Sequence, residues 1–296
     1  MPEIWFPNLG IEIAHLDRVA FTVFGRNVYW YGIFIGLAVV LGVLMAMKEA
    51  KRTGQSPDMY VDFIIYALIF AIIGARLYYV IFSWDFYSAH PEKIFALREG
   101  GLAIYGGIIG GVLTAIVYCK RKGVNFWLLA DTIAPCLAFG QMLGRWGNFF
   151  NREAFGGVAG DGNPWAMRIF FGDNYNISQV PDAVKEGMEK LKGMTLDQIG
   201  YIQVQPTFLY ESLWNLGVLV LMLIFRRKKK FDGEVFLWYL IGYGVGRAII
   251  EGMRTDQLIM PVTGWPVSQA LSLLLAIVSF AIVVTKRVKI SKSSNI

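Results

Sequence analysis

Charged residues are scarce in this chain: Asp, Glu, Lys and Arg make up 17% of its 296 residues, whereas soluble domains carry about a quarter. Hydrophobic residues make up 55% of the sequence, and the mean hydropathy is +0.48. This composition argues against an ordinary soluble domain. It predicts an integral membrane protein.

Cysteine and histidine are also scarce, with two of each. Cys119 and Cys136 fall inside apolar segments, so neither a disulfide framework nor a zinc site is indicated. His15 and His90 lie far apart and outside the apolar runs. We therefore expect no metal site.

The chain has a formal net charge of +6 and an isoelectric point near 9.2. Such an excess can indicate nucleic-acid binding. Here, however, the basic residues cluster in short loops between apolar runs, which is the pattern of membrane topology. We therefore expect a membrane lipid environment and no nucleic-acid partner.

The first 29 residues do not resemble a secretory signal peptide. They contain Glu3, Glu12 and Asp17, and they lack the basic start and continuous apolar core of such peptides. We expect this segment not to be a signal peptide.

Seven apolar runs are long enough to cross about 30 Å of hydrocarbon at a rise of about 1.5 Å per residue. They fall near residues 30–47, 60–82, 102–119, 126–146, 207–225, 234–252 and 266–285. The fourth and sixth runs contain more glycine and polar residues than the others. The pattern predicts an all-α integral membrane protein with about seven transmembrane helices, forming one polytopic domain over residues 1–296.

Basic residues follow every second run and set the expected orientation. The clusters after the first, third, fifth and seventh runs are Lys48, Lys51 and Arg52; Lys120, Arg121 and Lys122; Arg226 to Lys230; and Lys286, Arg287, Lys289 and Lys292. Because cytoplasmic loops carry the excess of Lys and Arg, the N-terminus is expected outside and the C-terminus in the cytoplasm. The long connection 147–206 between the fourth and fifth spans then forms an outward-facing head, with a soluble helix around Asp182–Lys192.

Several charged residues fall inside the predicted spans, where a charge at the centre costs roughly 2.5–3.5 kcal/mol on insertion scales. Arg76 lies in the second span, and Arg145 lies at the end of the fourth. In the sixth, Tyr243, Arg247 and Glu251 recur every four residues and so share one helix face. Arg247 and Glu251 can pair along that face.

In the expected orientation these residues all lie toward the outer ends of their spans. Tyr31 and Tyr105 lie near the outer starts of the first and third spans. One outer cavity would account for all of them together. Because guanidinium groups present a fixed fork of donors to phosphate or carboxylate, the expected ligand is a phospholipid head group.

Structural explanations of single residues also remain open. Tyr31 is typical of an interfacial anchor, and Arg247 with Glu251 could be a purely structural ion pair. The glycines at positions 106, 107, 110 and 111 have the spacing of close helix packing. Asp62 and Asp131 are interpreted as structural.

The segment GRWGNFFNREAFG at 144–156 carries the most specific pattern in the chain. It resembles the signature Gly-Arg-x-Gly-Asn-Phe-x-Asn-x-Glu-x-x-Gly of bacterial prolipoprotein diacylglyceryl transferases. Further segments are similar to motifs of that family: WYG at 30–32, GAR at 74–76, Gly-Gly-x-x-Gly at 106–110, QPTFLYE at 205–211 and GYGVGRAIIEGMR at 242–254. The resemblance extends along nearly the whole chain.

The resemblance implies an enzyme of the bacterial cytoplasmic membrane that works at its outer leaflet without a metal or organic cofactor. Its reaction would transfer the diacylglyceryl group of phosphatidylglycerol to the lipobox cysteine of a preprolipoprotein signal peptide, with release of glycerol phosphate. By motif, Arg145 and Arg247 would grip the departing phosphate. The remaining substrate-binding positions would be Tyr31, Arg76, Asn148, Asn151, Glu153, Gly156, Tyr243 and Glu251.

Tyr105 departs from the family pattern, because many members have a histidine immediately before the glycine pair of the third span. A phenol with a pKa of about 10 is a poor base at neutral pH. The acceptor thiol ionises near pH 8.5, and neighbouring arginines lower its pKa further. We therefore expect the cationic pocket to activate the thiol and Tyr105 to orient a substrate or pass a proton onward.

Two other function classes fit the polar residues. A transporter or flippase for an anionic solute would use the same arginines as a binding site, although transporters commonly contain paired repeats and the sequence shows none. A different phospholipid head-group transferase would share the lipid site but not the thiol acceptor. A lipobox peptide assay separates these functions.

Overall fold

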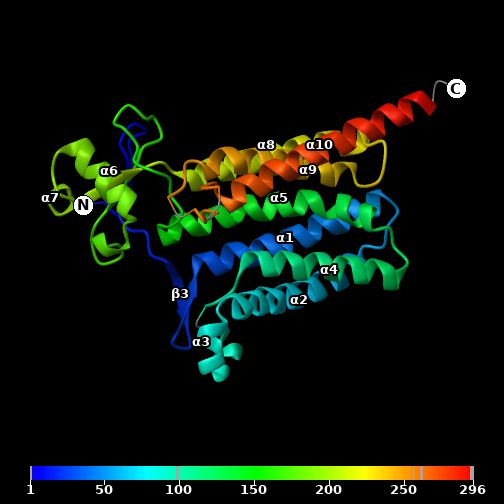
Figure 1. Cartoon of the computed structure of the whole chain (residues 1–296), viewed down its shortest axis with the longest axis horizontal. Helices are drawn as coiled ribbons and strands as arrows, with labels where there is room; N and C mark the ends of the chain where they lie inside the picture. Colours follow the sequence, from blue (N-terminus) through cyan, green and yellow to red (C-terminus); the bar gives the residue numbers. More distant parts are fainter. Residues whose placement is uncertain (1, 98–99, 256, 261–262, 294–296) are drawn as a thin grey trace. The chain divides into compact units, whose positions relative to one another are not determined.

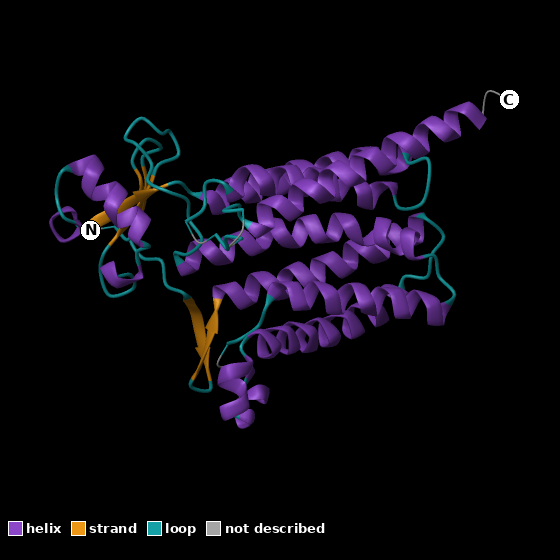
Figure 2. Ribbon diagram, in the orientation of Figure 1, coloured by secondary structure: helices purple, strands orange, loops and turns teal. Residues whose placement is uncertain are grey.

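The computed structural model describes residues 2–97, 100–255, 257–260 and 263–293 and is mostly helical (Figures 1 and 2). Seven long helices in these parts of the chain coincide with the seven predicted apolar runs. They are α1 (Trp30–Arg52), α2 (Asp58–Phe82), α4 (Ile104–Lys122), α5 (Phe126–Asn151), α8 (Thr207–Phe225), α9 (Glu234–Glu251) and α10 (Val267–Ser293).

Among the described residues, five helices are long and apolar enough to cross a membrane, namely α1, α2, α5, α8 and α10. Helix α9 has three charged residues within its 18 positions, and α4 ends in three basic residues, so both fall short by composition. The chain is therefore a multi-pass membrane protein. By this measure five of the seven predicted spans are confirmed.

The shorter elements precede α1 or lie between the long helices. They are the strands β1 (Ile4–Phe6), β2 (Ile11–Ile13), β3 (Val19–Val23), β4 (Arg26–Tyr29), β5 (Met167–Phe170) and β6 (Tyr201–Val204), and the helices α3 (Trp84–Ala89), η1 (Pro91–Phe95), η3 (Ile177–Gln179), α6 (Asp182–Lys192), α7 (Leu196–Ile199) and η4 (Arg226–Lys228). The chain divides into two compact units: residues 1–40 with 137–296, and residues 41–136. Each unit is described separately below.

The head of the first unit is built on a four-stranded antiparallel sheet with the order β2–β1–β5–β6. The predicted soluble helix is present as α6 and buries Val184 and Met188 against the head core. Strand β1 pairs Ile4 with Ile169 of β5. The N-terminal segment thus belongs to the head. Neither this contact nor the four-stranded sheet is predicted from the sequence.

Strands β3 and β4 form a separate hairpin whose turn contains Phe24 and Gly25. Both turn residues have positive φ, 49° and 74°, as a tight two-residue hairpin turn requires. Phe24 is fully exposed, and Phe21 and Val23 beside it are also exposed. The hairpin leads directly into α1 through Tyr29 and Trp30.

Helices α8, α9 and α10 lie side by side in the same unit (Figure 1). Gly246 of α9 lies beneath the indole ring of Trp214 on α8, and the Trp214 Nε1–H donates to the carbonyl of Gly242 over 2.8 Å. Gly244 lies against the backbone of α10 at Ser272. A side chain at either glycine would push the helices apart, so glycines of the 242–246 segment allow this close packing.

In the second unit, α2 and α4 pack through glycine (Figure 1). A Cβ at Gly106 would collide with the carbonyl oxygen of Gly74, and one at Gly110 with that of Phe70. The packing interpretation is confirmed for Gly106 and Gly110. It does not extend to Gly111, where a Cβ would have no described atom within 4 Å.

Candidate functional site

The segment 144–156 joins the end of α5 to the head. Helix α5 ends at Asn151, and the chain then turns through Arg152 and Ala154, both with left-handed φ values of 55° and 56°. Non-glycine residues rarely adopt this conformation, and it is found most often at functional sites. The turn directs the chain from α5 toward β5 and leaves the polar side chains of the segment on both sides of it.

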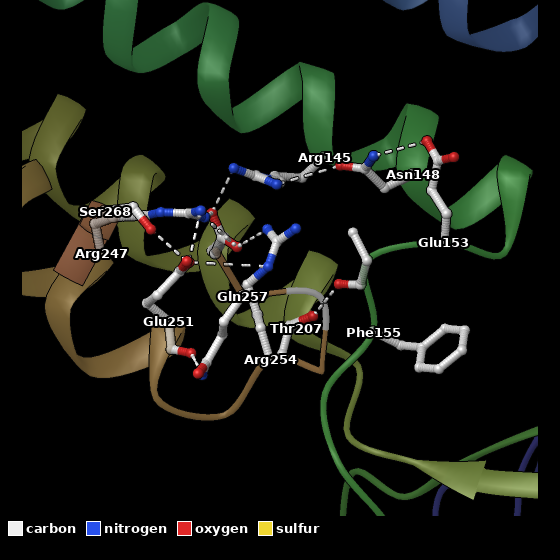
Figure 3. Close-up of polar contacts among 12 residues, drawn as sticks. Arg145, Asn148, Glu153, Phe155, Thr207, Arg247, Glu251, Arg254, Gln257 and Ser268 are labelled. Atoms are coloured by element: carbon white, nitrogen blue, oxygen red, sulfur yellow. Dashed lines mark hydrogen bonds and ion pairs between the residues drawn. The ribbon is translucent and has the colours of Figure 1, made fainter. Parts of the chain in front are cut away.

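Three arginines converge on one buried carboxylate (Figure 3). The Arg145 Nη2 lies 2.7 Å from the Oε2 of Glu211 on α8. The Nη1 of Arg247, on α9, and the Nη1 of Arg254, which follows that helix, lie 3.3 Å from oxygens of the same carboxylate. The structure therefore brings Arg145 and Arg247 together, and it adds Arg254. We call Arg145, Arg247, Arg254, Glu211 and Glu251 the arginine cluster.

Glu251 completes the cluster. Its Oε2 lies 2.6 Å from the Nη2 of Arg247, in the i,i+4 pairing that the sequence predicts. Ser268 on α10 donates its hydroxyl hydrogen to the other oxygen, and Gln257 donates to the Glu251 carbonyl (Figure 3). Glu251 is thereby held from α10 and from the chain after α9.

Charge and exposure in the arginine cluster favour binding of an anion. Three guanidinium groups face two carboxylates, which leaves one excess positive charge. The arginine side chains keep 10–20% of their surface exposed, whereas Glu211 and Glu251 keep 4% and 3%. The two carboxylates are thus more deeply buried than the three arginines that they hold. This arrangement suits a singly charged phosphodiester.

A chain of side-chain contacts extends from the cluster along the motif. Arg145 donates to the Asn148 Oδ1 over 3.3 Å (Figure 3). The amide groups of Asn148 and Asn151 both donate to the Oε1 of Glu153, over 3.0 and 3.1 Å. Four motif residues therefore form one connected polar network.

Gly156 is the crossing point of three segments. Its N–H donates to the carbonyl of Gln205 over 2.9 Å, and it forms an isolated bridge with Arg254. A Cβ at this position would lie 2.9 Å from the Met253 carbonyl oxygen and 3.0 Å from the Thr207 Cγ2. Glycine thus lets the motif segment approach the backbone that carries Arg254.

Tyr31 and Tyr243 lie on helices of the same unit. The ring of Tyr31, in the first turn of α1, covers Gly147 of α5 so closely that a Cβ there would collide with it. Tyr243 stacks on Tyr239 of α9 with ring centroids 5.7 Å apart. Gly147 in the motif therefore makes room for an aromatic residue from the predicted site.

Two predicted site residues belong to the second unit. Arg76 donates hydrogen bonds to the carbonyls of Lys93, Ile94, Gly100 and Gly101 over 2.6–2.8 Å, and its guanidinium lies over the ring of Tyr87. It therefore holds η1 and residues 100–101 against α2. Tyr105 lies in the first turn of α4 and is half-buried.

The sequence analysis does not assign Glu211 and Arg254 to the site. Glu211 lies in the QPTFLYE segment, at the start of the fifth predicted span, and a carboxylate inside a span is itself a signal of function. Arg254 follows the sixth span, where it resembles an ordinary loop residue. Its position beside Glu211 places it in the cluster, and its place at the end of the GYGVGRAIIEGMR motif is the signal that the sequence offered.

The described part of the chain contains no group of three or more His, Cys, Asp and Glu side chains that could hold a metal ion. The donors of the arginine cluster are guanidinium groups, which suit anionic oxygens. Fold and site together define a multi-pass membrane protein in which three arginines gather around two buried carboxylates.

Comparison with known proteins identifies the family. Residues 18–285 match the family model for prolipoprotein diacylglyceryl transferase. Relatives named phosphatidylglycerol–prolipoprotein diacylglyceryl transferase include one from Bacillus cereus (strain Q1), 42% identical over 277 residues, which cover 93% of this chain and 94% of the relative. Another, from Listeria monocytogenes serovar 1/2a, is 43% identical over 283 residues, which cover 96% and 94%. The chain belongs to the prolipoprotein diacylglyceryl transferase family.

Proposed function

We propose that this protein transfers the diacylglyceryl group of phosphatidylglycerol to the lipobox cysteine thiol of preprolipoprotein signal peptides. The names of its relatives state both substrates, phosphatidylglycerol and prolipoprotein. The observation that supports the chemistry is the meeting of Arg145, Arg247 and Arg254 around one buried carboxylate. The reaction is the first step of bacterial lipoprotein maturation and needs no cofactor.

In the proposed reaction, the cysteine sulfur attacks the glycerol carbon that carries the phosphate ester. The C–S bond forms as the C–O bond breaks, and the ester oxygen leaves with the electron pair as glycerol phosphate. The thiol proton passes to water when the thiolate forms, and glycerol phosphate leaves as a dianion. Because negative charge increases on the departing phosphate, the fixed guanidinium groups stabilise the transition state more than the bound lipid.

The roles of the other site residues follow from their contacts. Asn148, Asn151 and Glu153 hold the Arg145 end of the site, since they form one network with that guanidinium. Glu251 orients Arg247. We further propose that Tyr31, Tyr243, Gly156 and Arg76 line or shape the lipid site, and that Tyr105 orients the thiol or the lipid ester.

We also propose seven transmembrane helices in the bacterial cytoplasmic membrane, with the N-terminus and the 147–206 head outside and the C-terminus in the cytoplasm, all within one polytopic domain. The basic clusters at the C-terminal ends of α1, α4 and α10 and directly after α8 support this orientation. Arg145 and Arg247 lie in the halves of α5 and α9 away from those clusters. The site would then face the outer leaflet.

The test is incubation of the purified protein with phosphatidylglycerol vesicles and a lipobox peptide, followed by mass spectrometry. We expect a diacylglyceryl adduct on the cysteine and release of glycerol phosphate. Lipid turnover without this adduct would indicate a different head-group transferase. Lipid or solute movement without chemistry would indicate a transporter.

A further inference from the structure

A cavity lies in the first unit, between the head and the 144–156 segment. Its volume is about 710 Å³. The residues that matter here are Arg18, Tyr31, Asn151, Arg152, Glu153 and Tyr175. Its described lining includes none of the three arginines of the arginine cluster. The cavity therefore adjoins the 144–156 segment from the head side, through different cationic groups.

Three donors of this lining are buried and unsatisfied. The Nε of Arg18, the Nη1 of Arg152 and the hydroxyl of Tyr175 have no hydrogen-bond partner among the described residues. Arg152 and Tyr175 are 4% and 2% exposed. A buried donor without an acceptor carries its full desolvation cost, so such groups are usually paired. Three of them in the lining of one cavity indicate an acceptor that binds there.

The remaining contacts hold Arg152 in place. Its Nη2 donates to the carboxylate of Glu3 and to the Leu16 carbonyl over 2.6 Å, so the Nη1 is fixed by contacts on the other side of the same guanidinium. Asn174 donates to Glu3 and to Asp17. The carboxylates of Glu3 and Asp17 thus offset the positive charge of Arg152 on the head side.

The carboxylate that lines the cavity is also engaged. The Oε1 of Glu153 accepts from the side chains of Asn148 and Asn151. The buried lining atoms without a partner are all donors, namely the Arg18 Nε, the Arg152 Nη1 and the Tyr175 hydroxyl. A ligand that accepts several hydrogen bonds through its oxygen atoms, and that need not donate any to the protein, fits this set of donors. Among such ligands, a phosphate matches the planar guanidinium donors.

We propose that this cavity binds a phosphate group through Arg18, Arg152 and Tyr175, as a site separate from the arginine cluster. Two sources share this chemistry under the proposed function: the head group of phosphatidylglycerol and the glycerol phosphate that the reaction releases. The binding itself does not depend on the transfer activity, since the unsatisfied donors are present whatever reaction the protein catalyses.

The experiment measures binding of glycerol 1-phosphate to the full chain in phosphatidylcholine nanodiscs by calorimetry. The variants are Tyr175→Phe and Arg18→Gln, with Tyr201→Phe and Arg26→Gln as matched controls. Tyr201 is a head tyrosine in β6, and Arg26 is an exposed arginine of the β3–β4 hairpin. Each variant is also made together with Arg247→Gln, which weakens the arginine cluster.

We expect Tyr175→Phe and Arg18→Gln each to weaken binding about tenfold, as for lost hydrogen bonds to a charged group. The same loss should appear in the Arg247→Gln background, because the two sites are separate. The controls should bind as the unaltered protein does. Without ligand, Tyr175→Phe should unfold at the same or a higher temperature, since it removes an unpaired buried hydroxyl. This readout keeps lost binding distinct from lost folding.

Nanodiscs that contain phosphatidylglycerol distinguish the two sources. If the lipid head group occupies the cavity, the Arg247→Gln protein will bind glycerol 1-phosphate more weakly in these discs than in phosphatidylcholine discs. The double variant with Tyr175→Phe will bind it equally in both kinds of disc. If the cavity takes free glycerol phosphate, the lipid will have no such effect. Either result supports a phosphate site.

Unchanged binding in both cavity variants would overturn the proposal. So would competition by a lipobox peptide in place of either phosphate source, since the cavity would then be a peptide site. The transfer assay is a separate measurement. A protein that forms no adduct but binds glycerol 1-phosphate in this cavity would contradict the proposed function alone.

Discussion

The guanidinium of Arg145 on α5 and the carboxylate of Glu211 on α8 lie 2.7 Å apart, in a contact that joins two helices separated by more than 50 residues of sequence. The same carboxylate receives Arg247 and Arg254 over 3.3 Å. Glu211 is therefore the common anchor of the three guanidinium groups, and it holds them in position without occupying all of their donors.

Replacing Glu211 with Gln is expected to destabilise the protein and to abolish most of its activity. The amide keeps the shape but removes the charge that balances three arginines, and loss of one partner from a buried ion pair costs about 3–5 kcal/mol. Thermal unfolding in detergent and the adduct assay measure the two effects. Glu12→Gln, on the exposed strand β2, is the control. Equal behaviour of the two variants would contradict the anchoring role of Glu211.

Replacing Arg247 with Ala is expected to lower turnover by about 10²–10³-fold, the range measured for removal of a single electrostatic donor to a transition state. Rates of adduct formation at saturating lipid give this comparison. Arg227→Ala, in the basic segment after α8, removes an exposed arginine and should leave the rate unchanged. A nearly normal rate for Arg247→Ala would exclude the proposed role of that side chain.

Tyr105 tests how the acceptor thiol is activated. If the arginines lower the pKa of the thiol and Tyr105 only orients a substrate, Tyr105→Phe should retain reduced activity, and Tyr105→His should be tolerated. Adduct formation as a function of pH measures both. An inactive but correctly folded Tyr105→Phe protein would instead make the hydroxyl indispensable.

Gly156 and Gly157 provide a matched pair. A Cβ at Gly156 would lie 2.9–3.0 Å from atoms of Met253, Gln205 and Thr207. No described atom lies within 4 Å of a Cβ at Gly157. We expect Gly156→Ala to cost about 1–3 kcal/mol through overpacking and to displace Arg254, with reduced activity. Gly157→Ala should be nearly neutral. Thermal unfolding and the adduct assay compare them, and similar results for both would contradict the crossing role of Gly156.

The Glu3 carboxylate is expected to make the stability of the head depend on pH. Burial opposes its ionisation, but hydrogen bonds from Asn174 and the Leu16 N–H, together with Arg152, lower its pKa below the ordinary value of 4.5. Its contribution is therefore present above that value and is lost as the pH falls through the lower pKa of the folded state.

Thermal unfolding of Glu3→Gln and the unaltered protein measures this effect. The gap between them should be constant from about pH 7 to about pH 5 and should narrow at lower pH. Glu12→Gln serves as the control on the neighbouring strand. A gap that widens on acidification would show that the ionised carboxylate does not stabilise the head.

Helix positions were predictable from the sequence, because apolar runs and charge clusters mark each helix locally. The prediction for α6 was confirmed at both ends for the same reason. The head sheet was not predictable, since β1 and β5 contain only three and four residues and lie more than 150 positions apart. No local sequence pattern predicts a strand pairing over such a distance.

The candidate site shows the same division. The i,i+4 pair of Arg247 and Glu251 follows from helix geometry and was confirmed as an ion pair. The meeting of Arg145 with Glu211 depends on how α5 and α8 pack, and the role of Arg254 depends on the turn after α9. The roles of all these residues in catalysis stay predictions until the variants above are measured.

The arginine cluster also constrains how the protein is made. Helix α5 is synthesised before α8, and α8 before α9. Arg145 and Glu211 can therefore pair before Arg247 and Arg254 are synthesised. When α9 arrives, it brings Glu251 along with Arg247, so the excess charge changes by small steps. The order of the helices along the chain thus lets Arg247 and Arg254 meet carboxylates that are already present or that arrive with them, whereas Arg145 precedes its partner Glu211.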